Sequence, residues 1–177
     1  GFAQWLLDQK ELPWKYVCLD SCSELNDAFN ESLTLGRGVK FPRINDYRDT
    51  GIEMKRWLRN LRNLTYKGIN VIYLAQEDTV KIEDMGGEVM SEKIPKIGGK
   101  AGEVICGVVD FILPLRIDKK GNRYLQLDSD TKYLAKKREE PGREYPVQIP
   151  CPKGETNTLA EFFKLIKAPG TLPGSSA

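Results

Sequence analysis

A short apolar run that ends on an acidic residue and a hydroxyl constrains this chain more than any other feature. The run covers residues 15–19, and Asp20 and Ser21 follow it directly. A helix-like pattern then begins at Ser23. A buried strand that passes at once into a helix is typical of α/β folds. Because ligands of open α/β sheets bind at the carboxyl ends of the strands, this position makes Asp20 a candidate site residue.

A second run of similar character predicts a parallel sheet. Residues 69–76 are largely apolar and end on Gln76. Between the two runs, apolar residues recur at intervals of three and four, which predicts helices at 23–34 and 45–64. A strand, a helical crossover and a second strand predict a parallel α/β sheet. The two helices are joined by residues 35–43, a basic loop interrupted by glycines.

The C-terminal half predicts weaker elements. Residues 77–100 are polar, and a stretch of this length without periodicity is often a functional or mobile loop. Residues 139–154 are rich in proline and predict irregular structure. Short helices are expected at 2–10, 100–107 and 158–166, and strands of an antiparallel meander at 108–117, 123–127 and 132–135. The predicted division is a core of residues 1–138, an irregular segment with a short helix at 139–167, and a flexible tail at 168–177.

Length and composition narrow the function classes. With 177 residues, of which 40% are hydrophobic and 29% charged, the chain has the composition of one soluble domain. A net charge of +2 permits nucleic-acid binding without arguing for it. No segment has the pattern of a signal peptide or a membrane span, so we expect a cytoplasmic protein with no membrane partner. Because the chain begins at Gly1 inside a helix-like pattern, we also expect an N-terminal truncation.

The residues available for catalysis are limited. The chain has four cysteines and no histidine. The cysteines lack metal-ligand spacing, so a zinc site is not expected. Without histidine, the commonest general base is missing. Any catalysis must therefore use carboxylates, lysines, arginines or a bound metal.

Four features follow one another along the chain in an order that resembles a known family. They are the strand ending at Asp20-Ser21, the strand ending at Gln76, the segment Gly98-Gly99-Lys100-Ala101 before a short helix, and residues 133–138 at the close of the meander. The series resembles the C-terminal two-thirds of a RecA-like, AAA-type P-loop NTPase core. It is most similar to phage RecA-like proteins that accompany DNA recombination or single-strand annealing. The resemblance covers about residues 1–140 and implies a mainly parallel sheet flanked by helices, followed by an antiparallel meander.

The resemblance implies roles in binding ATP and Mg²⁺. Asp20 would position the shell of the metal, with Ser21 beside it. Gln76 would sense the γ-phosphate and pass that state to the loop after it. Lys136 and Arg138 match paired cations that reach the ATP of a neighbouring subunit, which implies a homo-oligomer.

The resemblance also implies contact with single-stranded DNA. The basic loop 35–43 and residues 77–97 would be the two loops that face DNA, with Gly98-Gly99 as a hinge. The cations that would contact DNA phosphates are Lys40, Arg43, Lys93, Lys96 and Lys100.

The chain departs from the family pattern at the phosphate loop. No G-x-x-x-x-G-K-[ST] string occurs in its sequence. The string Ile97-Gly98-Gly99-Lys100 lacks the first glycine and the hydroxyl residue, so it is not a phosphate loop. We therefore expect that the chain by itself does not hydrolyse ATP.

Simpler interpretations of the same residues stay open. Asp20 also suits the start of a helix, and Gln76 an ordinary strand end. Residues 136–138 also suit a solvated charged face. For the whole chain, one alternative is an assembly module on a degenerate P-loop fold. Another is a metal-dependent nuclease, which would need Asp20, Glu77 and Asp110 to converge on a metal.

Overall fold

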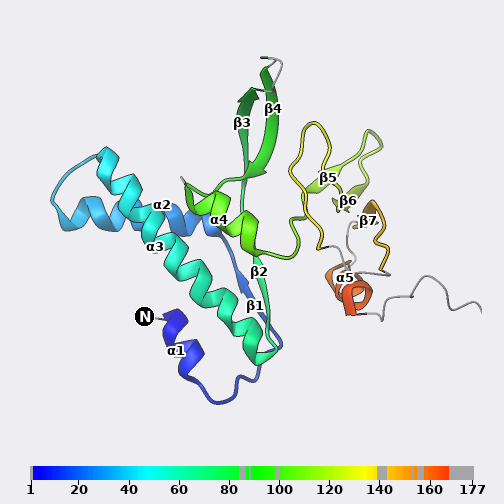
Figure 1. The fold of residues 1–177 in the computed structure, drawn as a ribbon, viewed down its shortest axis with the longest axis horizontal. Helices are drawn as coiled ribbons and strands as arrows, with labels where there is room; N and C mark the ends of the chain where they lie inside the picture. Colours follow the sequence, from blue (N-terminus) through cyan, green and yellow to red (C-terminus); the bar gives the residue numbers. More distant parts are fainter. Residues whose placement is uncertain are drawn as a thin grey trace, which may run out of the picture. The chain divides into compact units, whose positions relative to one another are not determined.

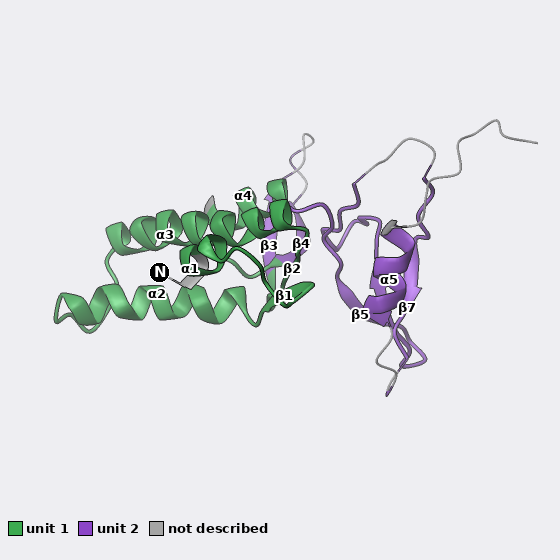
Figure 2. Cartoon of the chain, turned by 90° about the horizontal axis from the view of Figure 1, so that it is seen from below, with its two compact units in different colours: residues 1–78, 95–108 green, residues 79–94, 109–177 purple. Residues whose placement is uncertain are grey.

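The chain divides into two units, which we describe separately (Figure 2). A computed structural model describes residues 2–83, 87, 89–98, 100–138, 143–152, 154 and 158–167. The first unit contains residues 1–78 and 95–108, and the second contains residues 79–94 and 109–177. The domain boundaries that the sequence predicts after residues 138 and 167 stay predictions, and the expected flexible tail lies outside the described residues.

The first unit is built around a parallel pair of strands (Figure 1). Strand β1 (Tyr16–Leu19) pairs with β2 (Asn70–Tyr73) in a continuous register from Tyr16 opposite Asn70 to Leu19 opposite Tyr73. The predicted order of strand, helical crossover and strand is therefore confirmed. The predicted second strand is too long, because regular pairing stops at Tyr73, three residues before Gln76.

Helices make up most of the first unit. The crossover consists of α2 (Cys22–Gly36), α3 (Ile44–Arg62) and the short 3-10 helix η1 (Asn63–Lys67), with α1 (Phe2–Asp8) before β1 and α4 (Lys100–Val108) at the end of the unit. Each predicted helix is present, with bounds that differ by a few residues. None of the described helices is long and apolar enough to cross a membrane.

The strand pair is held in place by one apolar cluster. Leu6, Leu61, Leu64 and Ile69 are buried together. The half-buried side chains of both strands pack against this cluster, namely Val17, Leu19, Val71 and Tyr73. The Tyr73 hydroxyl also donates a hydrogen bond to the carbonyl of Leu58 in α3, at 2.8 Å. The helices therefore fix the position of both strands and of the residues that follow them.

Residues 77–83 and 89–95 form strands rather than the loop that the sequence predicts. Strands β3 (Glu77–Glu83) and β4 (Val89–Pro95) pair as a two-stranded ribbon (Figure 1). Most β3 side chains are exposed on both faces, so the ribbon has no apolar alternation to reveal it in the sequence. We call residues 77–95 the β3–β4 ribbon.

The second unit contains an antiparallel sheet of three strands. Its order is β5 (Leu115–Ile117), β6 (Arg123–Gln126) and β7 (Gln148–Pro150), and α5 (Thr158–Lys167) follows in the chain. Buried Leu127, Ile149 and Phe162 form its core. The Phe111 ring meets the Phe162 ring edge-on, with centroids 5.0 Å apart.

Two details of the predicted meander are wrong. Its third strand is β7, from the segment predicted to be irregular, and not residues 132–135. Residues 132–135 are instead bound by side chains of the preceding turn, which leaves only isolated bridges at Tyr133 and Lys136. The predicted strand 108–117 is also shorter, because Val108 ends α4 and regular pairing begins at Leu115.

The fold is α/β with small sheets. The described strands form sheets of two, two and three strands, and only β1 and β2 pair in parallel among them. The larger, mainly parallel sheet of a RecA-like core is therefore not confirmed.

Candidate functional site

Three of the predicted site residues lie where β1 and β2 end. Asp20 and Ser21 follow β1, and Gln76 follows β2 by three residues. We call these three residues the strand-end site. The side chains of Asp20 and Gln76 are exposed. Asp20 is therefore accessible to a ligand from solvent.

Backbone hydrogen bonds continue the pairing beyond the strands. The Leu74 amide donates to the Leu19 carbonyl at 3.0 Å, and the Cys22 amide donates to the Leu74 carbonyl at 2.7 Å. Asp20 and Ser21 lie between these two bonds in the chain, and the peptide bond that joins them is cis. The segment after β2 is thus tied to the start of α2.

Ser21 caps α2. Its backbone is extended, and its hydroxyl accepts a hydrogen bond from the Glu24 amide at 3.3 Å. A serine in this position satisfies one of the free amides of the helix. The start of a 15-residue helix also carries a partial positive charge, which favours an anion beside Asp20.

Ser23 connects the strand-end site to the base of the β3–β4 ribbon. Its side chain is 2% exposed. Its hydroxyl accepts from the Gln76 amide at 3.0 Å and donates to the Lys96 carbonyl at 2.8 Å. The Lys96 amide in turn donates to the Gln76 carbonyl at 2.7 Å. Because Gln76 precedes β3 and Lys96 follows β4, α2 holds both ends of the ribbon.

We expect Ser23→Ala to lower the free energy of unfolding by about 1–3 kcal/mol, because the Gln76 amide and the Lys96 carbonyl both lose a part-buried hydrogen bond to the Ser23 hydroxyl. Urea denaturation followed by circular dichroism measures this change. Ser32→Ala is the matched control, since Ser32 is an exposed serine of the same helix. Equal stability of the two variants would contradict the role of Ser23.

The basic loop between α2 and α3 is held by a buried carboxylate. Asp46 is fully buried, forms an ion pair with Arg37, and accepts a hydrogen bond from the Arg43 amide at 2.7 Å. Arg43 stands directly before α3, and both its side chain and that of Lys40 are exposed. Phe41 is 71% exposed, with the Lys40 amine 5.6 Å from its ring centroid.

The other predicted DNA-binding cations lie on or after β4. Lys93 is half-buried in β4, and its backbone bonds to Lys132 and Leu134. Lys96 is exposed. Gly99 and the side chain of Lys100 lie outside the described residues. The described ribbon carries more acidic than basic side chains: Glu77, Asp78, Glu83 and Glu92 against Lys81 and Lys93.

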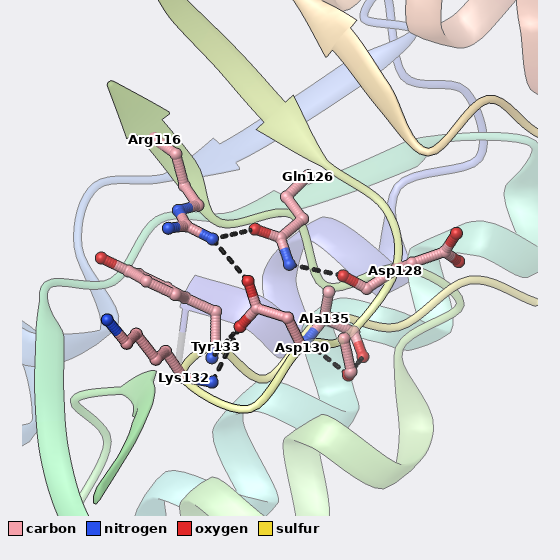
Figure 3. Close-up of polar contacts among 8 residues, drawn as sticks. Arg116, Gln126, Asp128, Asp130, Lys132, Tyr133 and Ala135 are labelled. Atoms are coloured by element: carbon pink, nitrogen blue, oxygen red, sulfur yellow. Dashed lines mark hydrogen bonds and ion pairs between the residues drawn. The ribbon is translucent and has the colours of Figure 1, made fainter. Parts of the chain in front are cut away.

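Arg116 organises the second unit (Figure 3). Its guanidinium donates to the Gln126 side chain at 2.6 Å and to the Asp130 carboxylate at 2.7 Å. It also lies 3.8 Å from the centroid of the Tyr133 ring. Partial burial acts to raise the pKa of Asp130, but hydrogen bonds from the Lys132 and Tyr133 amides and from Arg116 outweigh it, and the pKa is lowered.

This network positions the segment that carries Lys136 and Arg138. The Ser129 hydroxyl bonds to both the amide and the carbonyl of Ala135, which closes the turn (Figure 3). Lys136 is half-buried, and its backbone pairs with Ile112. Arg138 forms an ion pair with Asp110 at 2.8 Å, with both side chains more than half exposed. An exposed pair of this kind is weak, so Arg138 can exchange partners.

The described residues contain no group of three side chains suited to hold a metal ion by themselves. The nuclease alternative, which needs such a group, therefore has no support from them. Magnesium in phosphate sites commonly takes one or two carboxylates together with phosphate oxygens, and Asp20 meets that requirement.

The Cys22 thiol lies next to the strand-end site in the chain. Burial, and secondly the charge of Cys18, raises the pKa of Cys22 to about 12, so its thiol stays protonated at neutral pH.

Sequence reasoning missed two residues that shape these sites. Ser23 and Asp46 are buried polar residues whose partners lie far along the chain or across a loop. The sequence carries one signal for Asp46. It lies three positions after Arg43 at the start of a helix, and an acidic residue there is part of a capping pattern. Nothing in the sequence around Ser23 distinguishes it from its neighbours.

An acidic residue at the end of a parallel strand, beside a helix start and the end of the neighbouring strand, lies at the edge where open α/β sheets bind their ligands. The model of the AAA domain family matches residues 3–139. The chain therefore belongs to the AAA domain family, a family of AAA-type P-loop NTPases. No curated protein and no solved structure gives a match.

Proposed function

We propose that the strand-end site binds ATP with Mg²⁺, and that the protein is an ATPase whose nucleotide state is coupled to DNA binding. The observation that carries this proposal is the parallel pairing of β1 and β2, which sets Asp20 and Gln76 at the same edge. In AAA-type P-loop NTPases, this edge is where the metal and the terminal phosphate are contacted. Family membership over most of the chain supports the same conclusion.

Asp20 would hold the metal shell, and the start of α2 would face the phosphates. When bound, Mg²⁺ supplies charge neutralisation at the phosphate oxygens. Because residues 1–177 contain no phosphate-loop string, Asp20 provides only part of such a site. We therefore expect these 177 residues alone to have no ATPase activity.

Gln76 would transmit the state of the site to the β3–β4 ribbon. Its backbone amide and carbonyl are both engaged, through Ser23 and Lys96. A displacement of Gln76 toward a γ-phosphate would therefore act on the residues that begin and end the ribbon. The structural requirement for such a switch is a segment with two arrangements that the ligand binds unequally.

Lys136 and Arg138 would act on the ATP of a neighbouring subunit in a homo-oligomer. The network around Arg116 fixes the turn before them, and Arg138 is exposed at its end. A cation supplied in this way stabilises the charge of the transition state. Release of Arg138 from Asp110 would accompany contact with the phosphates.

Single-stranded DNA is the proposed regulatory partner, in recombination or annealing of phage type. The loop between α2 and α3 offers Lys40 and Arg43 for phosphates, and an exposed Phe41 for stacking on a base. The other proposed DNA contacts are Lys93 in the β3–β4 ribbon, and Lys96 and Lys100 after it. The alternative is an assembly module without ATPase activity.

Stimulation of ATP hydrolysis by single-stranded DNA tests this proposal in the protein at its full natural length. We expect single-stranded DNA to stimulate hydrolysis by the wild type, and this stimulation to be lost in Gln76→Ala. Gln148→Ala is the control, since Gln148 is an exposed glutamine of β7. Equal stimulation of both variants would contradict the sensor role, and a wild type that binds no ATP would support the assembly module.

A further inference from the structure

A groove lies at the end of the β1–β2 pair where both strands begin. Its volume is about 380 Å³. Its basic and aromatic lining comes from Lys10, Lys15, Lys67 and Trp14. Glu11, Leu12, Gly68 and Ile69 complete the walls. We call it the lysine groove.

The groove is separate from the strand-end site. Lys15 directly precedes β1, and Ile69 directly precedes β2, whereas Asp20 and Gln76 follow these strands. Strands of four residues span about 13 Å. A ligand in the groove therefore cannot be the nucleotide proposed at the strand-end site.

The walls of the groove are fixed by the fold. The Lys67 amine donates to the carbonyls of Leu7 and Gln9, at the end of α1. The Lys15 carbonyl accepts from the Asn70 amide at 2.9 Å and from its side-chain nitrogen at 3.2 Å. Leu12 packs on the apolar cluster of the unit. The segment from Gln9 to Lys15 is therefore anchored at both ends and in the middle.

The lining of the groove carries more positive than negative charge, with three lysines and one glutamate. Lys67 is used by the two carbonyls, but among the residues that the structure describes no acidic side chain pairs with Lys10 or Lys15. Glu11 is the one acidic residue of the lining. The Trp14 side chain is 49% exposed, so its indole is accessible, and Trp14 lines the groove together with both lysines.

We propose that the lysine groove binds a nucleoside phosphate unit, with the base stacked on Trp14 and the phosphate held by Lys10 and Lys15. An aromatic face stacks on any base, and neighbouring lysines suit the phosphate. A volume of about 380 Å³ is at the small end of ligand sites and suits one such unit. The nucleoside phosphate is either a free nucleotide or one nucleotide of a single strand. An acidic peptide fits less well, because it has no base to stack on the Trp14 indole.

Photocrosslinking without ATP and Mg²⁺ tests this proposal in the protein at its full natural length. The probes are 5-iododeoxyuridine monophosphate and a thymidine oligomer that carries one 5-iododeoxyuridine, and mass spectrometry locates the adduct. We expect an adduct on Trp14. An adduct from both probes identifies a free nucleotide as sufficient, and an adduct from the oligomer alone identifies the single strand. No adduct on Trp14 with either probe would overturn the proposal.

Substitution of the lysines tests the charge part of the proposal. For one phosphate held by the two lysines at about 0.1 M salt, Lys10→Gln with Lys15→Gln is expected to lower oligomer affinity at the Trp14 site by about 5- to 8-fold. Lys119→Gln with Lys120→Gln removes the same charge from an exposed turn of the second unit and is the control. A Trp14 adduct that is equally strong in both double variants would overturn the proposal. Asp20→Asn should leave the adduct unchanged, so the groove and the ATP site can fail separately.

Discussion

In the protein at its full natural length, Asp20→Asn is expected to lower Mg²⁺-dependent ATP hydrolysis by at least about a hundredfold, because the change removes the charge that orders the metal shell. Asparagine has the same shape and is also accepted near a helix start, so the thermal midpoint should change little. Initial rates at several Mg²⁺ concentrations, with thermal unfolding beside them, measure both effects.

The matched control for this substitution is Asp27→Asn. Asp27 is an exposed carboxylate in α2, the helix that follows Asp20. If Asp20 only served to start α2, its substitution would leave both the thermal midpoint and the hydrolysis rate at the level of the Asp27 variant. That result would favour the simpler interpretation of the residue.

In the protein at its full natural length, Arg138→Ala is expected to lower ATP hydrolysis by about 1,000-fold or more, because a cation supplied in trans stabilises transition-state charge. Binding of ATP to the subunit that carries the substitution should persist. Asp110→Ala, which removes the ion-pair partner of Arg138, is the control and should retain hydrolysis. Steady-state rates and binding of a fluorescent ATP analogue separate the two effects.

Mixed oligomers test whether Arg138 acts across a subunit interface. In a mixture of Asp20→Asn and Arg138→Ala subunits, some interfaces combine an intact Asp20 with an intact Arg138. The mixture should therefore hydrolyse ATP faster than either variant alone. Rates no higher than those of the separate variants would show that Arg138 does not act in trans.

The sequence predicted the elements of the first unit well because their patterns are local. Apolar residues at helical spacing mark α2 and α3, and β1 and β2 are short apolar runs between polar segments. The β3–β4 ribbon escaped prediction because its side chains are mostly exposed on both faces. Strand β7 escaped because its three residues pair with β6, more than 20 positions earlier in the chain.

The candidate site was predicted in part for the same reason. Asp20 and Gln76 are marked by the strands before them, whereas Ser23 is defined only by contacts with residues 53 and 73 positions away. The partner of Arg138 is likewise 28 positions distant. Long-range hydrogen bonds between polar residues leave no periodic trace in a sequence, so they become visible only in the fold.

The central claim is that Asp20 and Gln76 share one ligand at the end of the β1–β2 pair. Paramagnetic broadening of backbone amide signals by Mn²⁺ with a non-hydrolysable ATP analogue tests it most directly, in the protein at its full natural length. The account predicts strong broadening at Asp20, Ser21 and Gln76, weak broadening at Gly68 on the opposite edge, and its loss in Asp20→Asn. Broadening centred elsewhere, or unchanged by that substitution, would contradict the account.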